Sequence, residues 1–403
     1  MKNNNQNQWK NKIIRFLTAQ TVSLLGSSLV QYAIVWYITL STSSGAMLTI
    51  STICGFAPQI IISLFAGVWI DRYSRKRLIM LSDGIIAAST LILAILFLTG
   101  YKNLWVLFIV LAVRSAGTGI QTPAVNALIP QIVPKEYLIK IIGINSTIMS
   151  LIMFLSPALS GTILSVSSLE TVLFIDVITA IIGISITFTI AVSNYSRAEG
   201  IGKSSLHDIK MGFVYLKENS FVKRLLLFQI VVLFLISPSA FLTPLMVSRT
   251  FGMEVWRLTL GEMTYSAGTA LGGILIATWG GFKNRMDTTI LAGAAYGLLM
   301  IAMGLSPVFP VYLVFNLLIG VTAPCYNSPI TVMIQEKVEP SMHGRVFSFV
   351  QIATSCALPI GMVLFGPIAD KVRIQSLLIV AGGLVAVFTV TVLLFNRRMS
   401  KDL

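Results

Sequence analysis

The sequence predicts an all-α membrane protein with twelve transmembrane helices, and its composition and length are the main reasons. Of its 403 residues, 55% are hydrophobic and only 11% are charged, whereas soluble domains carry about 25% charged residues. The apolar runs are continuous and do not alternate with every second residue, which excludes a transmembrane β-barrel. At about 20 residues per span, the length accommodates twelve helices with short loops.

The expected spans follow the apolar runs in order. In the first half they are 13–40, 45–70, 78–99, 104–127, 138–166 and 170–192. In the second half they are 225–248, 260–281, 287–306, 310–334, 345–369 and 374–396. The longest polar stretch, 193–224, divides an N-terminal bundle, residues 1–192, from a C-terminal bundle, residues 225–403. Apolar residues at helical spacing within that stretch predict an amphipathic helix at the membrane surface.

The distribution of basic residues predicts how the chain is oriented. If the N-terminus is cytoplasmic, roughly 23 of the 29 Lys and Arg lie on the cytoplasmic side. Both termini are therefore expected in the cytoplasm of a cell with this protein in its inner (cytoplasmic) membrane. Orientation also explains the net charge of +14 better than nucleic-acid binding does. The three cysteines lie in apolar runs without paired spacing, so we expect no metal site, disulfide or cofactor.

An internal repeat supports the division into two bundles. Thr122-Pro123 aligns with Ser328-Pro329, and Pro134 aligns with Pro340, both at an offset of about 206 residues. Two parallel six-helix repeats are the arrangement of major facilitator transporters. The alternative is a coincidence between proline-containing helix ends.

The loop after the second expected span carries a motif that resembles this family. Gly67, Asp71, Arg72, Arg75 and Lys76 match the family pattern Gly-x-x-x-Asp-Arg-x-x-Arg-Lys between the second and third helices. Arg77 follows directly, and Asp83 is expected to join the cluster around Asp71. The resemblance implies a gating role in which Asp71 contacts the start of the eleventh span, near His343. The alternative is that the basic residues only set the orientation.

Arg114 is the only basic residue deep in an expected span. An arginine keeps its charge, so it must meet a carboxylate, carbonyl groups or water there, and an intramembrane charge indicates a functional site. Its surroundings resemble the fourth-helix arginine motif of major facilitator exporters, which implies a role in proton coupling. A structural ion pair is the alternative. Asp176 and Glu262 are the preferred proton carriers, because desolvation would favour their neutral form.

The fifth span resembles the antiporter motif of drug-exporting facilitators. Its matching positions are Gly143, Ser156, Pro157, Ser160 and Gly161. Serines replace two of the family's glycines, and Ile152 departs further from the pattern. Tight helix packing, which uses the same small residues, is the alternative.

Polar residues at helical spacing in several spans are candidates for a substrate cavity. Those of the first half are Gln20, Ser23, Ser27, Gln31, Thr118, Gln121 and Asn145, with Met149 as adaptable apolar surface. Those of the second half are Asn316, Thr322, Tyr326 and Asn327. For any one of them, a hydrogen bond between helices is the alternative.

The sequence as a whole resembles the macrolide-efflux branch of the major facilitators. That resemblance implies export of a small hydrophobic drug in exchange for protons, by a monomer in the lipid bilayer. Exporters of siderophores, peptides or lipids and a nutrient importer of the same family remain alternatives. A membrane enzyme would need His, Asp or Glu clustered at membrane depth, and a channel would need a filter sequence; neither is visible.

Overall fold

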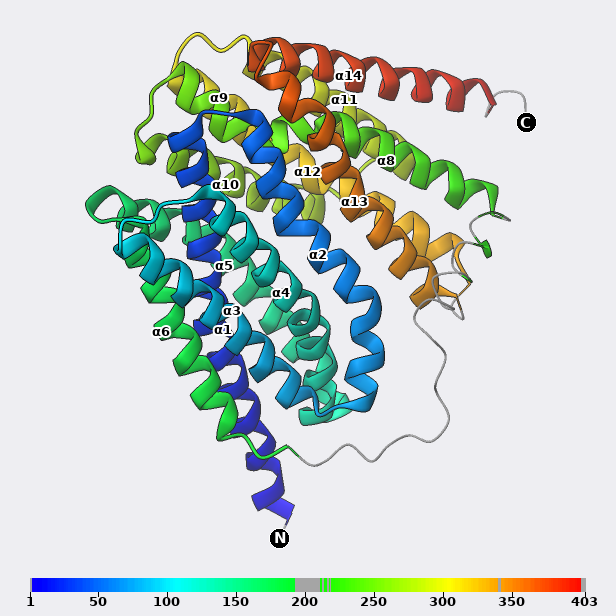
Figure 1. Ribbon diagram of the computed structural model, residues 1–403. Helices are drawn as coiled ribbons and strands as arrows, with labels where there is room; N and C mark the ends of the chain where they lie inside the picture. Colours follow the sequence, from blue (N-terminus) through cyan, green and yellow to red (C-terminus); the bar gives the residue numbers. More distant parts are fainter. Residues whose placement is uncertain are drawn as a thin grey trace. The chain divides into compact units, whose positions relative to one another are not determined.

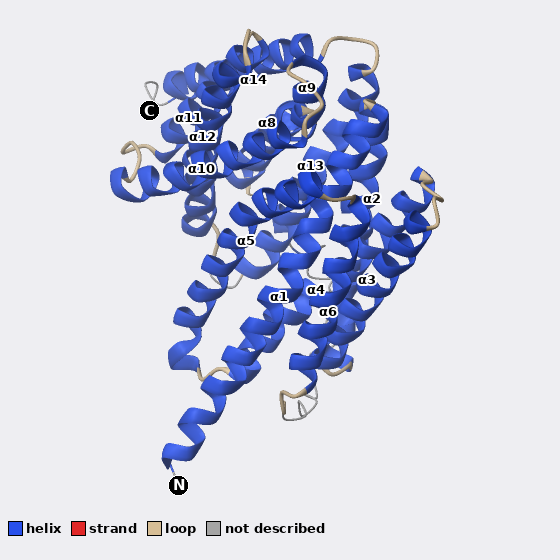
Figure 2. Ribbon diagram, turned by 90° about the vertical axis from the view of Figure 1, so that its left-hand side faces the viewer, coloured by secondary structure: helices blue, strands red, loops and turns tan. Residues whose placement is uncertain are grey.

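The computed structural model describes residues 2–192, 211, 214–215, 217, 219–339 and 342–399. Within these residues the regular structure is helical, without a β-strand (Figure 2). The chain forms two compact units. Unit 1 comprises Met1–Tyr37 and Ile50–Leu206, and unit 2 comprises Ile38–Thr49 and His207–Leu403. The amphipathic helix predicted within 193–224 falls mainly outside the described residues.

The described part of unit 1 is built from six long helices. They are α1 (Lys2–Thr42), α2 (Gly45–Arg72), α3 (Arg75–Leu98), α4 (Leu104–Ile132), α5 (Leu138–Val166) and α6 (Leu169–Phe188), with a single 3-10 turn at Lys135–Tyr137. The first residues of α2 and the last of α1 belong to unit 2. Helix α3 packs against both α4 and α6. The side chain of Asn103 caps α4 by accepting a hydrogen bond from the Trp105 N–H at 2.8 Å.

The described part of unit 2, from Ser220 onward, adds six long helices and one short one. They are α8 (Ser220–Phe241), α9 (Thr243–Thr250), α10 (Val255–Trp279), α11 (Arg285–Gly304), α12 (Phe309–Lys337), α13 (His343–Ala369) and α14 (Ile374–Met399). Helix α11 packs against α12 and α14, α10 against α12, and α8 against α13 (Figure 1). Asn219 and Asn284 cap α8 and α11 with their side chains. Gly280 ends α10 in the left-handed conformation, at φ 76°, which glycine adopts without strain.

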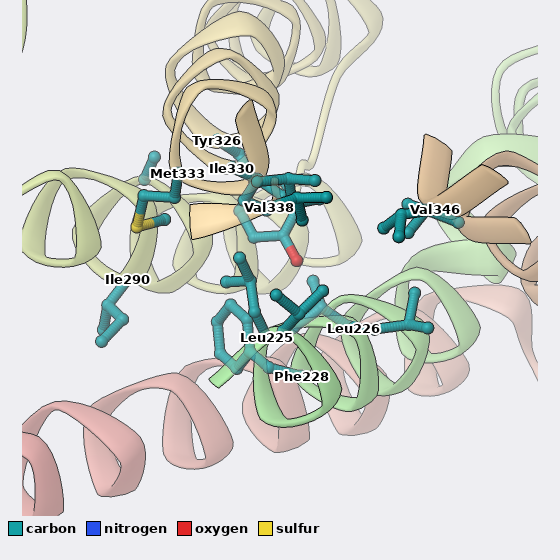
Figure 3. Packing of buried hydrophobic residues seen from close by; sticks show 14 of the residues in the cluster. Leu225, Leu226, Phe228, Ile290, Tyr326, Ile330, Met333, Val338 and Val346 are labelled. Carbon is teal, nitrogen blue, oxygen red and sulfur yellow. The ribbon is translucent and has the colours of Figure 1, made fainter. Parts of the chain in front are cut away.

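The core of unit 2 lies between α8, α11 and α12. Leu225 and Phe228 of α8 face Tyr326 and Ile330 of α12, and Ile290 comes from α11 (Figure 3). Such close contact matters because lipid is as apolar as these side chains, so van der Waals packing holds the helices together.

The outer surface of the helices is apolar, as a bilayer requires. Ile139 and Val166, for example, are 88% and 82% exposed. Among the described residues, eleven helical segments are long and apolar enough to cross a membrane. The remaining expected span, 260–281, corresponds to α10, which has 25 residues but a more polar sequence that includes Arg257 and Glu262. The predicted all-α polytopic fold is confirmed.

The helix positions repeat along the chain. Helices α12, α13 and α14 each begin 205 residues after α4, α5 and α6, respectively. Helices α4 and α12 both have 29 residues, and Pro123 and Pro329 lie inside them at nearly the same place. The element pattern therefore matches the repeat that the paired prolines indicate.

Candidate functional site

A buried ion pair joins α4 to α6 in unit 1. Arg114 is 6% exposed and Asp176 is fully buried, and the guanidinium donates to the carboxylate. The Thr90 hydroxyl of α3 donates to the same carboxylate oxygen at 3.1 Å and itself accepts from Arg114. On α1, the Ser27 hydroxyl donates to the other carboxylate oxygen at 3.0 Å, and the Ser27 carbonyl accepts from Arg114 at 3.3 Å. Four helices thus meet at one charge-neutral network.

Glycines bring α1 close enough to α6 for this network to form. A Cβ on Gly26 of α1 would meet the side chain of Thr179 and the backbone of Asp176. A Cβ on Gly183 of α6 would meet the Ala19 carbonyl and the Ser23 side chain of α1 at 3.0 Å each. Small residues at a helix interface allow such close approach. The short separation of α1 and α6 therefore depends on the missing side chains of these two glycines.

A second buried polar contact repeats the pattern on the next turns of α3 and α4. The Gln121 amide donates to the Asp83 carboxylate at 2.8 Å, and both side chains are buried. Asp83 and Thr90 are seven residues apart, as are Arg114 and Gln121, which is about two helical turns. One face of α3 therefore meets one face of α4 through both contacts. Asp83, expected beside Asp71, instead binds Gln121.

The other predicted cavity residues of unit 1 lie in different surroundings. Gln20 is buried, and within the described part of the chain neither of its amide atoms has a hydrogen-bond partner. Ser23 is also buried, Gln31 is exposed, and Thr118 donates its hydroxyl to the Arg114 carbonyl at 3.0 Å. Asn145 and Met149 are half-buried on α5. Of the predicted cavity residues in unit 1, Ser27 contacts both members of the ion pair. Thr118 bonds to the main-chain carbonyl of Arg114.

In unit 2, Glu262 of α10 lines a cavity of about 120 Å³ together with tyrosines from three helices. The tyrosines are Tyr265 of α10, Tyr296 of α11 and Tyr312 of α12. Tyr312 is fully buried, and its hydroxyl has no hydrogen-bond partner among the described residues. The Glu262 carboxylate makes neither a hydrogen bond nor an ion pair with any other described residue. The two membrane carboxylates singled out by the sequence therefore differ, because Asp176 is paired and Glu262 is not.

The predicted cavity residues of α12 lie around this space and its neighbour. The Asn316 amide lines the Glu262 cavity and donates to the Gly261 carbonyl at 2.6 Å. Tyr326 and Asn327 line an adjoining cavity of about 160 Å³, which shares Tyr265 and Tyr296 with the first. Thr322 instead donates its hydroxyl to the Ile319 carbonyl at 2.7 Å. Three of the four predicted residues therefore face these adjoining spaces.

The basic loop motif lines a surface hollow of about 720 Å³ at one end of unit 1. Lys76 donates to the Phe188 and Ile190 carbonyls, at 2.7 and 2.9 Å, at the C-terminal end of α6. Arg75 donates to the Ala127 carbonyl of α4 at 2.8 Å. A cation near the last carbonyls of a helix is favourable. Within the motif, Gly67 lies in the last turns of α2, and three side chains are exposed: Asp71, Arg72 and Arg77.

The antiporter-like motif of α5 packs against α1 at one end. Ser156, Pro157, Ser160 and Gly161 are buried, and the Ser160 hydroxyl donates to the Leu29 carbonyl at 3.0 Å. Gly143, at the other end of the motif, is exposed, and a Cβ added there would meet nothing within 4 Å. The motif therefore combines a tightly packed end with an open one.

Sequence reasoning missed two parts of these sites. Thr90 touches both members of the ion pair, and its only signal is its spacing of two turns from Asp83. Tyr265, Tyr296 and Tyr312 surround the Glu262 cavity from three helices, and nothing in the local sequence brings them together.

Comparisons with known proteins place the chain in a family. The model of the Major Facilitator Superfamily matches residues 16–355 and 256–402. Macrolide efflux protein A of Streptococcus pyogenes is 30% identical over 403 residues, which cover 98% of this chain and 99% of that protein. Macrolide efflux protein A of Enterococcus faecalis is 29% identical over 320 residues, 79% of this chain and 99% of that protein.

Solved structures agree with this fold. The nucleoside transporter NupG has a TM-score of 0.71 at 14% identity and covers 94% of this chain and 98% of its own. A POT family transporter in complex with a thioalcohol-conjugated peptide has a TM-score of 0.72 at 12% identity, with 96% of both chains covered. The chain belongs to the Major Facilitator Superfamily, a family of membrane transporters. The predicted resemblance to its macrolide-efflux branch is confirmed.

Proposed function

We propose that this protein is a secondary active transporter that exports hydrophobic, macrolide-like drugs from the cytoplasm in exchange for protons. The observation that carries the proposal is the match to macrolide efflux protein A along nearly the whole of both chains. A match of that extent includes every helix of the fold. It therefore supports the same class of transport and the same direction.

The two membrane carboxylates support different roles in proton exchange. Arg114 already neutralises the charge of Asp176, so Asp176 would have to leave this ion pair before it could take up a proton. Among the residues that the structure describes, no cation forms an ion pair with Glu262, and an unpaired charge at membrane depth costs several kcal/mol. We therefore assign the exchanged proton to Glu262. Arg114 and Asp176 hold α1, α3, α4 and α6 in the arrangement that the exchange requires.

The orientation and organisation of the chain complete the proposal. Both termini lie in the cytoplasm, the protein works as a monomer in the cytoplasmic membrane, and residues 193–224 link a six-helix bundle on each side. The drug contacts the polar residues predicted for the cavity. The spaces of about 120 and 160 Å³ in unit 2 are smaller than the 300–1,000 Å³ typical of drug sites, so drug entry requires the helices to move.

Drug accumulation in a macrolide-sensitive bacterium tests this function. Cells that express the protein should hold several-fold less labelled macrolide than cells with the empty vector, and a protonophore should abolish the difference. Unchanged accumulation in both comparisons would rule out macrolide export. A difference that survives the protonophore would rule out proton exchange and leave export standing.

A second candidate is siderophore export. The staphyloferrin A transporter of Staphylococcus aureus is 19% identical over 392 residues, 96% of this chain and 97% of that protein. This identity is lower than that of the macrolide relatives, so siderophore export ranks second. Staphyloferrin A release from producing cells, with and without this protein, separates the two candidates.

A further inference from the structure

The turn between α1 and α2 is held by a carboxylate from the other end of the chain. Asp370, which ends α13, accepts hydrogen bonds from the Gly45 N–H at 2.7 Å, the Ala46 N–H at 2.9 Å and the Ser44 hydroxyl at 2.8 Å. These amides are the first of α2 and have no partner within their own helix. A negative charge at this end of a helix is also favourable. Asp370 thus caps α2 from about 325 residues away in the sequence.

Arg249 completes the attachment from a third element. At the end of α9, it donates to the Asp370 carboxylate at 3.0 Å, to the Ala369 carbonyl at 2.6 Å and to the Ser43 carbonyl. Ser43 has a φ of 50°, a conformation that costs free energy in a residue with a side chain and persists only where its surroundings hold it. Arg249 provides such a hold on the turn.

Two glycines let the backbones of α2 and α13 touch beside this cap. A Cβ on Gly45 would meet the Gly366 carbonyl, and a Cβ on Gly366 would meet Gly45 and the side chain of Thr49. The Thr49 hydroxyl lies 3.1 Å from the Met362 carbonyl. The attachment therefore combines hydrogen bonds, an ion pair and a close backbone contact. We call it the outer clasp: Ser43–Ala46 and Thr49 on one side, and Arg249, Gly366 and Asp370 on the other.

The outer clasp joins a short segment to one unit while the helices on both sides of that segment belong to the other. Residues 38–49 pack with unit 2, whereas 1–37 and 50–206 form unit 1. We propose that the outer clasp is the extracellular gate of the transporter, closed while the substrate path faces the cytoplasm and released when the drug leaves the cell. The proposal rests on the proposed export function and orientation, because alternating access requires the two bundles to separate in turn at each surface.

The alternative is a permanent strut, and reversible cross-linking distinguishes it from a gate. The test uses Ala46→Cys and Lys371→Cys, in a variant whose Cys54, Cys325 and Cys356 are replaced by serine. Both new thiols lie beside clasp atoms, and neither removes a clasp hydrogen bond. A cleavable thiol cross-linker should reduce export at least about tenfold, and its cleavage should restore export. Cross-linked protein that exports normally would overturn the gate.

A matched pair controls for the effect of cross-linking itself. The Thr250 hydroxyl accepts from the Gln375 amide at 2.7 Å, close to the clasp but between two parts of unit 2 that are not interrupted by unit 1. Thr250→Cys cross-linked to Gln375→Cys should leave export unchanged. If this pair also stops export, cross-linking at this surface is harmful in general and the gate loses its support.

A second measurement needs neither drug nor protons, so its failure differs from a failure of the proposed function. Spin labels on cysteines at Ser41 and Lys371 report the distance across the clasp in purified protein. Asp370→Ala should raise the open fraction about fivefold, as expected when charge-assisted hydrogen bonds at a half-exposed site are lost. Gly366→Ala should have a similar effect, because its Cβ would meet Gly45 and the side chain of Thr49. Gly383→Ala on α14, where a Cβ meets nothing within 4 Å, is the control and should change nothing.

The outcomes separate the two proposals. If the distances lengthen but no macrolide is exported, the gate stands and the substrate is wrong. If both clasp variants keep the wild-type distances while the protein still exports, the outer clasp is not a gate. Using both an electrostatic and a steric variant also guards against a misfolded mutant, since only one of them removes a charge.

Discussion

At the scale of single residues, each member of the buried Arg114–Asp176 pair depends on the other for its charge to be tolerated. Removal of one partner leaves the other charge buried and unpaired, which costs about 3–5 kcal/mol. Arg114→Ala should therefore abolish export while the protein still inserts, and its thermal unfolding in detergent should occur several degrees lower. Near-normal drug efflux by Arg114→Ala would contradict this role.

The double variant separates charge from geometry. With both Arg114 and Asp176 replaced by alanine, no isolated charge remains, so part of the lost thermal stability should return. Export should not return, because the contacts to Ser27 and Thr90 are also gone. Thermal unfolding of the two single variants and the double variant, measured in parallel, checks the expectation. A double variant as unstable as the sum of the single ones would contradict it.

Glu262 offers the sharpest test of proton exchange. Glu262→Gln keeps the size and polarity of the side chain but cannot bind or release a proton, so proton-driven export should fall at least about tenfold. Facilitated equilibration of the drug down its own gradient should persist. Glu254→Gln is the matched control, since Glu254 is an exposed acid in the same unit and its ion pair with Arg257 is worth little. Equal loss in both variants would remove Glu262 from this role.

The polar residues of the spans could be predicted from the sequence, but their partners could not. The apolar setting of Arg114 predicts a polar partner, and the ion pair with Asp176 supplies it. The identity of that partner depends on the placement of α4 beside α6, which no local pattern encodes. The same holds for Tyr312, whose buried hydroxyl approaches α10 from α12 at Gly261. Single polar residues in apolar spans can thus be identified early, whereas their pairings require the fold.

At the scale of elements, close approach of α1 and α6 is a testable condition for the ion pair. Gly183→Leu would push α6 from the Ala19 backbone and Ser23, and thereby separate Ser27 from Asp176. We expect a fall of several degrees in thermal stability, as for overpacked interfaces, and a loss of export. Gly84→Ala on α3 is the control, because its Cβ would meet nothing within 4 Å. Stable, active Gly183→Leu protein would contradict the close-packing explanation.

The outer clasp has a predictable response to pH. Partial burial raises the pKa of Asp370, but the hydrogen bonds from Ala46, Gly45, Ser44 and Arg249 outweigh this and leave the pKa below its ordinary value. A carboxyl with a lowered pKa contributes its stabilisation above the ordinary value, about 4, and loses it as the pH falls through the lowered one. The label distances across the clasp should therefore not change between pH 8 and about pH 5. Opening within that range would show that another group controls the clasp.

Element boundaries followed the sequence closely, with one instructive exception. The expected span 104–127 extends as α4 to Ile132, and 170–192 is α6 from Leu169 to Phe188. The expected span 225–248, however, divides into α8 and α9 at Leu242. Pro244 stands in the first turn of α9, where its missing N–H is tolerated and a new helix can start. Hydropathy alone does not reveal this break, because Leu245, Met246 and Val247 of α9 continue the apolar run of α8.

At the scale of the whole molecule, the two ends of α13 belong to two different proposed contacts. The family resemblance predicts that Asp71 contacts the start of α13, on the cytoplasmic side in the proposed orientation. At the other end of α13, Asp370 caps α2. The same helix would then carry one partner of a latch at each end. Two latches of this kind oppose each other, because each stabilises a different state of the same equilibrium.

Because the contacts of Asp370 and Asp71 would stabilise opposite states, removing both should have a smaller effect than removing either one. Asp370→Ala should shift purified protein toward the state open to the outside, and Asp71→Asn should shift it toward the state open to the cytoplasm. Each shift alone should slow export, because a cycle needs both states to be populated. The double variant should recover a distribution of label distances near that of the wild type, and part of the export rate with it. If the losses of export in the two single variants simply add in the double variant, the two contacts do not act on one equilibrium. That result would contradict opposing roles for the two ends of α13.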